Sequence, residues 1–124
     1  MLIQAKNISK SFDKGAHFAL KNVSVGIDTG EFIAIIGLSG AGKSTFLRAI
    51  NGTSELSAGE LQVLGQELTK LHGRKLRQLR KHIGFVFQQF NLVKSLSVLQ
   101  NVLMGRIAYM PLWRALTGFF SAAD

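Results

Sequence analysis

The alternation of hydrophobic and polar residues predicts several strands along the first two-thirds of the chain. Residues 2–9 form an extended, partly apolar run, and apolar residues alternate with small or polar ones over 23–27. The latter pattern is typical of a strand with one buried face. The uninterrupted, β-branched run 32–36 predicts a central strand covered on both faces. Shorter apolar runs at 61–64 and 83–87 predict two more strands.

Helical periodicity appears between and after these runs. Apolar residues recur at helical spacing over 44–51, and leucines form an approximate helical stripe over 68–82. Ser97 is the predicted N-cap of a helix with apolar side chains at 98, 99, 102 and 103 on one face. Strands and helices that alternate in this way indicate an α/β fold.

Composition narrows the class of protein. The 124 residues are 47% hydrophobic and 18% charged, as in a packed globular domain, and the absence of cysteine excludes a disulfide scaffold or a cysteine-based zinc site. The first residues contain no apolar run of signal-peptide length, so we expect a cytoplasmic location. The most apolar stretch, 98–120, is interrupted by Arg106, Pro111 and Arg114, so we do not expect it to span a membrane.

The net charge of +8 is unevenly distributed. Residues 1–69 carry six basic and six acidic side chains, whereas residues 70–124 carry nine basic side chains and one acidic one. Six of those nine lie between Lys70 and Lys81, where the leucine stripe would leave them on the exposed face of a helix. Although a nucleic-acid surface is the alternative, we interpret the cluster as a solvated helix face and expect no nucleic-acid partner.

A glycine-rich motif stands between the predicted strand 32–36 and the predicted helix 44–51. It reads Gly37, Leu38, Ser39, Gly40, Ala41, Gly42, Lys43, Ser44 and Thr45. The first eight residues fit G-x-x-x-x-G-K-[ST], the phosphate-binding loop (P-loop, or Walker A motif), in the required strand–loop–helix context.

Each residue type in the motif has a chemical role. The glycines let the backbone turn its N–H groups toward phosphate oxygens, and the helix that follows adds the positive end of its dipole. Lys43 would reach the β- and γ-phosphates, the Ser44 hydroxyl would bind Mg²⁺, and Thr45 would add a backbone donor. The alternative is a chance glycine-rich turn.

The chain resembles the ATP-binding subunits of ABC transporters. The loop has their narrower form Gly-x-Ser-Gly-x-Gly-Lys-Ser-Thr, and Gly-Glu-Phe precedes the strand at 30–32. Residues 9–12 resemble the family's N-terminal segment, and residues 85–92 resemble its Q-loop. The resemblance implies a P-loop NTPase fold of the ABC ATPase type, with a mixed β-sheet around the P-loop helix and the start of a helical subdomain.

The resemblance also implies roles for two further residues. Phe12 would stack on adenine, and Gln88 would meet Mg²⁺ and the attacking water. Other interpretations stay open, because Phe12 also fits a core aromatic, Phe18 is a competing aromatic, and Gln88 also fits a polar strand end. The implied nucleotide site therefore comprises Phe12, residues 37–45 and Gln88, with ATP and Mg²⁺ as cofactors and with Ser44 and Gln88 at the metal.

Partners and location follow from the same resemblance. Family members form homodimers of ATP-binding subunits on the cytoplasmic face of the inner membrane, with transmembrane permease subunits and a periplasmic or extracellular substrate-binding protein. Residues 95–102 are similar to the segment that faces the permease, although Gln100 stands where an acidic residue is usual. Residues 102–106 and 111–116 are similar to the branch of importers that carries phosphonates.

Several parts of the family's machinery have no counterpart in these residues. The sequence lacks a Leu-Ser-Gly-Gly-Gln signature segment, a strand ending in Asp-Glu and a switch histidine, so Lys43 and Gln88 contribute to a catalytic set without a general base. We expect a truncated, N-terminal half of the domain. Its predicted core comprises 1–67 and 83–90, and its helical segments comprise 68–82 and 91–124.

Three functions stay open at this point. The first is the energy-coupling ATPase of a phosphonate-type importer, seen in part, whose 124 residues alone lack hydrolytic activity. The second is a truncated protein that binds nucleotide without hydrolysis. The third is another P-loop kinase or GTPase, against which the Q-loop resemblance and the absence of Asn-Lys-x-Asp argue.

Overall fold

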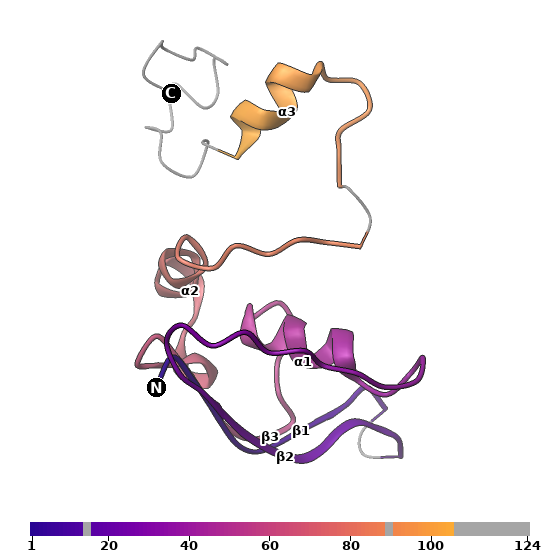
Figure 1. The fold of residues 1–124 in the computed structure, drawn as a ribbon, viewed down its shortest axis with the longest axis vertical. Coiled ribbons are helices and arrows are strands. Elements are labelled where there is room, and N and C mark those ends of the chain that lie inside the picture. Colours follow the sequence, from indigo (N-terminus) through magenta and orange to yellow (C-terminus); the bar gives the residue numbers. More distant parts are fainter. Residues whose placement is uncertain (14–15, 89–90, 106–124) are drawn as a thin grey trace. The chain divides into compact units, whose positions relative to one another are not determined.

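The computed structural model describes residues 1–13, 16–88 and 91–105, which belong to two compact units, Met1–Gly84 and Phe85–Asp124. The helices and strands are shown in Figure 1. In the first unit they are β1 (Ile3–Ser11), β2 (Phe18–Ile27), α1 (Lys43–Ile50), β3 (Ala58–Val63), β4 (Gln66–Glu67), the 3₁₀ turn η1 (Leu68–Lys70) and α2 (Gly73–Arg80). The second unit contains α3 (Val98–Met104). Among the described residues, no helix is long and apolar enough to cross a membrane.

The first unit is built on a sheet with strand order β2-β1-β3-β4. The pairs β1–β2, β1–β3 and β3–β4 are all antiparallel. These strands confirm the predictions at 2–9, 23–27 and 61–64, and β2 begins at Phe18, five residues before the predicted range 23–27. The alternating pattern indicated the strands, whereas their order and register depend on tertiary pairing.

Two reciprocal bulges adjust which side chains face the core. Ala5 pairs with Val25 and Ile8 with Val23, so β1 carries one extra residue here, opposite Ser24. The extra residue puts the apolar Ile8, which is fully buried, on the core face in place of Asn7. Asn7 adopts φ of +48° and donates its backbone N–H to Ser24 Oγ at 2.8 Å, while Ser24 Oγ donates to Asn7 Oδ1 at 3.1 Å.

The same arrangement occurs with the strands exchanged. Between Val23 and Leu20, β2 carries the extra residue opposite Ser9, so that Leu20 rather than Lys21 is buried. Asn22 has φ of +51°, and its N–H and Oδ1 both bond to Ser9 Oγ, at 3.0 and 3.4 Å. Asparagine tolerates the left-handed conformation better than other non-glycine residues, which explains its place at both bulges.

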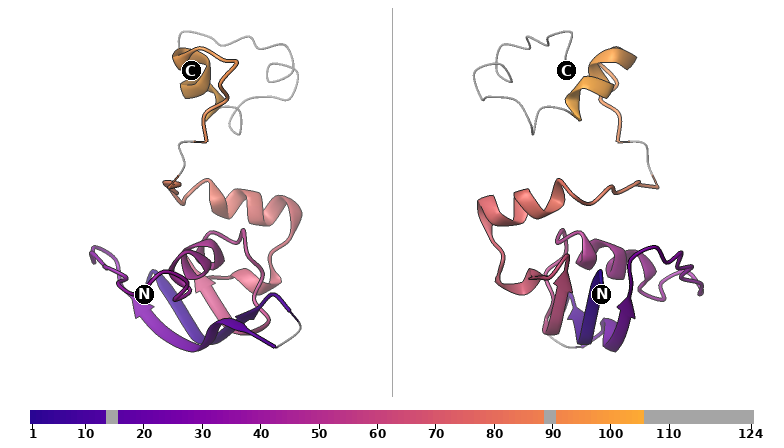
Figure 2. Two further views of the ribbon diagram at one scale, coloured as in Figure 1. Left: turned by 90° about the vertical axis from the view of Figure 1, so that its right-hand side faces the viewer. Right: turned by 60° about the vertical axis from the view of Figure 1, so that its left-hand side comes forward.

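The P-loop helix packs against one face of this sheet (Figure 2). Phe46, Ala49 and Ile50 are the buried residues of α1. They form a single core with buried residues of the strands, η1 and α2, namely Ala5, Ile8, Leu20, Leu61, Val63, Leu68 and Leu79. The predicted helix 44–51 is thereby confirmed, and Phe46 and Ile50 of its apolar face are buried, whereas Leu47 is 45% exposed.

Two predicted strands are wrong. Residues 32–36 form no strand, and Phe32 is 95% exposed although its run was expected to be covered on both faces. Residues 83–87 also form no strand. A strand requires hydrogen-bonding neighbours, and no strand of the described residues pairs with either run. Apolar, β-branched composition alone therefore did not suffice.

The basic segment 68–82 is helical in two pieces. The turn η1 and the helix α2 bury Leu68 and Leu79, while Arg74, Lys75 and Arg77 are exposed. This confirms the interpretation of a leucine stripe with a solvated basic face. Arg80 is the exception, because its side chain is part-buried and bonded to the end of α1.

In the second unit, α3 begins as the sequence predicted. Ser97 Oγ accepts the backbone N–H of Gln100, and Gln100 Oε1 accepts the backbone N–H of Ser97, which is a complete capping box. The apolar side chains of α3 are not buried by the described residues, since Val98, Leu99 and Val102 are all exposed. The predicted elements after residue 105 lie outside the described residues.

Candidate nucleotide-binding site

The phosphate-loop motif adopts a conformation that only glycines accommodate without strain. Gly40 and Gly42 have φ of +83° and +84°, in the left-handed region. Around Gly40 there is open space, whereas a Cβ added to Gly42 would lie 2.1 Å from the carbonyl oxygen of Ala19. Ala19 is an extra residue of β2 where Lys10 pairs with Leu20 and Ser11 pairs with Phe18. The end of the loop therefore packs directly against the start of β2.

Lys43, the first residue of α1, folds back over the loop. Its Nζ donates to the carbonyl oxygens of Gly37 and Leu38, both at 2.7 Å. The Leu38 carbonyl also accepts the Ala41 N–H at 3.2 Å. The ammonium group therefore lies beside the first two residues of the loop and places a positive charge there.

The N-terminal end of α1 offers hydrogen-bond donors. Its first helical hydrogen bond runs from the Phe46 N–H to the Gly42 carbonyl. The N–H groups before Phe46 therefore have no acceptor within the helix. No side chain caps this end of α1, and its first turn contains no acidic residue. Together with the Lys43 ammonium, these donors fit the phosphates of a nucleotide, and the oxygen of the exposed Ser44 hydroxyl fits an associated Mg²⁺.

Phe12 lies just beyond the end of β1 and is 72% exposed, so the alternative of a core aromatic is wrong. Lys10 Nζ lies 5.0 Å from the centroid of its ring. The competing aromatic, Phe18, is also exposed. Since Ser11 pairs with Phe18 and the next residue, Ala19, faces Gly42, the hairpin that carries both aromatics is next to the phosphate loop. An adenine-stacking role for Phe12 remains a prediction.

Asp13 organises the described part of the same hairpin. Its Oδ1 accepts the His17 N–H at 2.7 Å and the Ser11 hydroxyl at 2.8 Å, and its Oδ2 lies 2.6 Å from His17 Nδ1. The backbone and ring of His17 and the hydroxyl of Ser11 together lower the pKa of the Asp13 carboxyl. The turn role expected for Asp13 is thus accompanied by a local hydrogen-bond network beside Phe12.

Gln88 is exposed and belongs to the second unit. It follows Phe85 and Phe87, whose ring centroids are 4.6 Å apart. Because no strand includes residues 83–87, the interpretation of Gln88 as a polar strand end is not supported. Its predicted contact with Mg²⁺ and water stays a prediction.

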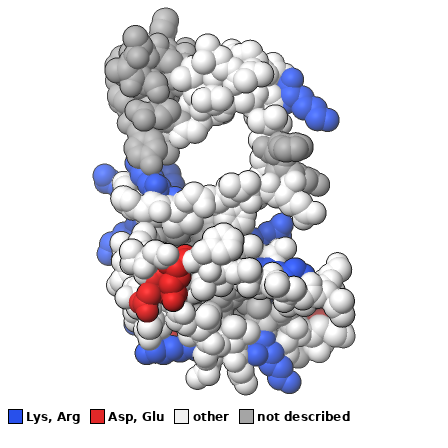
Figure 3. Space-filling view, viewed as in Figure 1, with Lys and Arg blue, Asp and Glu red and all other residues white. Residues whose placement is uncertain are grey.

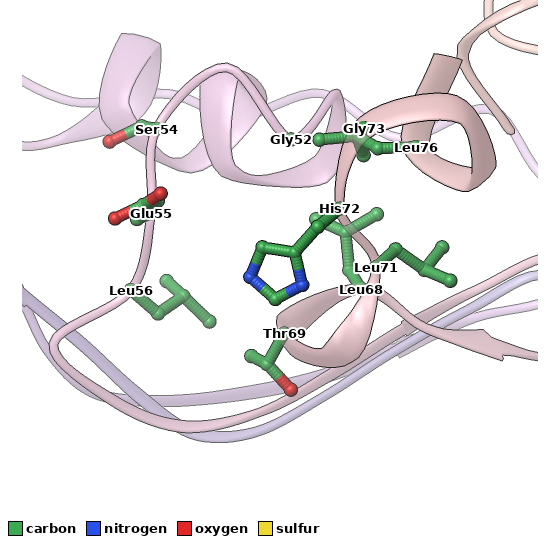
Figure 4. Close-up of a pocket in the computed structure, with 10 residues that line it drawn as sticks. All are labelled: Gly52, Ser54, Glu55, Leu56, Leu68, Thr69, Leu71, His72, Gly73 and Leu76. Atoms are coloured by element: carbon green, nitrogen blue, oxygen red, sulfur yellow. The ribbon is translucent and has the colours of Figure 1, made fainter. Parts of the chain in front are cut away.

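A cavity of about 370 Å³ lies elsewhere in the first unit, between the segment after α1 and the η1–α2 segment (Figure 4). Leucines 56, 68, 71 and 76 line it together with polar residues such as Glu55 and His72. None of the phosphate-loop residues lines it, and no buried side-chain polar atom of the described residues lacks a hydrogen-bond partner. We therefore place the nucleotide site at the loop rather than in this cavity.

The charged side chains of the described residues form no continuous patch on the face shown in Figure 3. On the face shown in Figure 3, the basic side chains appear in separate groups with uncharged surface between them. No cluster of three or more metal-ligating side chains occurs in the described part of the chain. The described histidines share no site: His17 bonds to Asp13, and His72 contacts a backbone carbonyl.

Two contributions to the site were not predicted. The Ala19 carbonyl contacts Gly42 because β2 has an irregular register, for which the sequence has no clear signal. Arg80 contacts the far end of α1, and its position beside Leu79 on the leucine-bearing face was the only available signal. Ala19 lies against the end of the phosphate loop, and Arg80 bonds to the backbone at the opposite end of α1.

These features identify the class of protein. The sequence profile of the ABC transporter family matches residues 20–122, and the chain belongs to that family. It is 48% identical over 122 residues to "Phosphonates import ATP-binding protein PhnC" of Staphylococcus aureus (strain USA300), covering 98% of this chain and 47% of that protein. The chain thus spans about half the length of the curated relatives it matches.

Solved structures show the same relationship. "Dimeric Structure of MJ0796, a Bacterial ABC Transporter Cassette" matches with a TM-score of 0.82 and 37% identity, covering 98% of this chain and 51% of that one. The cassette MJ0796 "bound to ADP and Pi" in a post-hydrolysis state matches with a TM-score of 0.77 and 36% identity, covering 93% and 54% of the two chains. The predicted ABC ATPase type of P-loop fold is confirmed.

Proposed function

We propose that this chain is the nucleotide-binding part of an ATP-hydrolysing, energy-coupling subunit of an ABC importer for phosphonates. The observation that carries the proposal is the phosphate loop, in which left-handed glycines, the Lys43 ammonium and the amide end of α1 come together. The similarity to phosphonate import ATP-binding proteins supports the substrate class. A P-loop subunit does not select the transported molecule by itself, so that assignment depends on the relatives.

Different residues would contact different parts of the bound nucleotide. Loop amides and Lys43 would hold the phosphates, Ser44 and Gln88 would hold Mg²⁺, and Phe12 would stack on the adenine. Bound Mg²⁺ would neutralise phosphate charge as it develops. The chain supplies no signature segment and no Asp-Glu strand end, so we propose that these 124 residues bind nucleotide with negligible turnover.

The proposal extends to partners and location. A homodimer of ATP-binding subunits would act with transmembrane permease subunits and a substrate-binding protein, at the cytoplasmic face of the inner membrane. Neighbouring structures of dimeric cassettes support the dimer, and the importer relatives support the other two partners.

Substitution of Lys43 tests the nucleotide site. Lys43→Ala removes the ammonium group that bonds to the loop, and we expect MgATP affinity to fall at least about tenfold, since a charged hydrogen bond contributes roughly 1.5–3 kcal/mol. Titration of a fluorescent ATP analogue into the full chain measures this. Lys75→Ala, which removes an exposed lysine of α2, is the control and should bind as wild type does. Wild-type affinity in Lys43→Ala would disprove the site.

A further inference from the structure

Arg80, the last residue of α2, has a different environment from its neighbours. Arg74, Lys75 and Arg77 of the same helix are exposed, whereas the Arg80 guanidinium is part-buried against the end of α1. Its Nε donates to the Asn51 carbonyl at 3.0 Å, and its Nη2 donates to the Gly52 carbonyl. One planar group therefore binds two successive carbonyls, a geometry that the fork of arginine provides and a lysine ammonium does not.

The Asn51 carbonyl belongs to the C-cap residue of the P-loop helix, and the Gly52 carbonyl follows directly after it. The carbonyl groups at the C-terminal end of a helix lack helical partners and form the negative end of the helix dipole. The Arg48 carbonyl is already bonded to the N–H groups of Thr53 and Ser54. The Ala49 carbonyl accepts the Gly52 N–H at 2.9 Å, and Arg80 bonds to the carbonyls of Asn51 and Gly52. Asn51, the C-cap residue, is only 7% exposed. A cation is thus placed where both hydrogen bonding and the dipole favour it.

The contact is supported by close packing of α2 on this end of α1. Gly52 has φ of +67°, and a Cβ added there would lie 2.8 Å from Leu76 Cδ1. Figure 4 shows Gly52 and Leu76 next to each other at the edge of the cavity. Leu79, which precedes Arg80, is 1% exposed and belongs to the core. The turn of α2 that precedes the arginine contact is therefore packed against the end of α1 and the core.

We infer that Arg80 is a positioning residue for nucleotide binding, which acts through α1. The helix has eight residues, about 12 Å in length, and its opposite end carries Lys43, Ser44 and the loop amides. Because a short helix moves as one body, holding its C-terminal end fixes the direction of the donors at its N-terminal end. Phosphate binding needs such donors held within about 0.5 Å. This inference rests on the proposed function.

The experiment compares full-length wild type with Arg80→Gln, Arg80→Lys and the control Arg77→Gln. Dissociation constants for MgATP and for magnesium tripolyphosphate are measured well below each variant's melting temperature, where all variants are folded by circular dichroism. We expect Arg80→Gln to weaken the binding of both ligands about tenfold, which corresponds to roughly 1.4 kcal/mol of binding free energy. Arg80→Lys should recover part of the affinity, and Arg77→Gln should bind as wild type does.

The outcomes separate positioning from stability and from net charge. A purely structural Arg80 would lower the melting temperature and leave both dissociation constants of the folded protein unchanged, which overturns the inference. An equal loss in Arg77→Gln would show general charge attraction and would overturn it too. If Arg80→Gln does not fold, Arg80→Lys decides by the same criterion. Failure of the wild type to bind either ligand would instead contradict the proposed function.

Discussion

Substitution of Gly42 by alanine tests how the phosphate loop is seated on the sheet. Gly42 has φ of +84°, and the Cβ of an alanine would lie 2.1 Å from the Ala19 carbonyl oxygen and 3.2 Å from Leu20 Cδ2. A backbone oxygen cannot move aside as a flexible side chain can. Either the loop or the start of β2 has to shift by about an ångström to reach a contact of about 3.0–3.4 Å, which is the tight end of normal carbon–oxygen packing.

The magnitude is obtained with a matched control. Gly30 has φ of +85°, but nothing lies within 4 Å of its added Cβ. Gly30→Ala therefore measures the left-handed backbone cost alone, about 1–2 kcal/mol. In Gly42→Ala, overpacking adds about 1–3 kcal/mol to the same cost. Any gain from stiffening the unfolded chain, about 0.4–1 kcal/mol, is common to both variants and cancels in the comparison.

Equilibrium unfolding in urea, followed by circular dichroism, measures the difference. With a slope of about 1–3 kcal/mol per molar urea, the midpoint of Gly42→Ala should lie roughly 1 M below that of Gly30→Ala. Binding of MgATP should also be weaker in Gly42→Ala, because the end of the loop is displaced from β2. Equal midpoints for the two variants would refute the reasoning, since the contact with Ala19 would then have no energetic effect.

Two other predictions concern the β1–β2 hairpin. Phe12→Ala should weaken MgATP binding about five- to a hundredfold, since base stacking contributes roughly 1–3 kcal/mol. It should leave the urea midpoint and tripolyphosphate binding unchanged, because Phe12 is exposed. Equal losses of affinity for ATP and tripolyphosphate would exclude stacking. The pKa of Asp13 is lowered in the folded state, so its stabilising effect is present above its unfolded pKa of about 3.9 and is lost as the pH falls through the lower folded pKa. Carboxyl NMR titration should give a midpoint for Asp13 below 3.9, and an ordinary midpoint would contradict the network with His17.

Sequence patterns predicted the elements that are amphipathic on their own. The alternation over 23–27, the helical spacing in 44–51 and the Ser97 cap each depend on local chemistry, and each corresponds to an element of the structure. The runs 32–36 and 83–87 form no strand, because a strand depends on neighbours that no local pattern specifies. The start of β2 at Phe18 depends in the same way on its pairing with β1.

In the candidate site, too, local sequence features could be predicted and tertiary contacts could not. The motif predicts the residues of the phosphate loop, since the spacing of its glycines and of Lys43 follows from phosphate chemistry, and the structure shows left-handed Gly40 and Gly42 and a Lys43 side chain bonded to the loop. The contact of the loop with Ala19 joins residues 23 positions apart in sequence, and the contacts of Arg80 at the end of α1 join residues 28 and 29 positions apart; all of them arise from packing. A single sequence does not show which of several arginines faces inward, and Arg80 differs from Arg77 only by its position relative to Leu79.

The two serine–asparagine pairs of the hairpin bear on how this chain tolerates change. Each serine hydroxyl accepts the amide of a left-handed asparagine on the other strand and donates to the same side chain. Loss of either partner leaves the other with unmet hydrogen bonds, so single replacements are costly while a joint replacement costs less than their sum. Asn7 with Ser24, and Ser9 with Asn22, therefore behave as two coupled pairs rather than four independent positions.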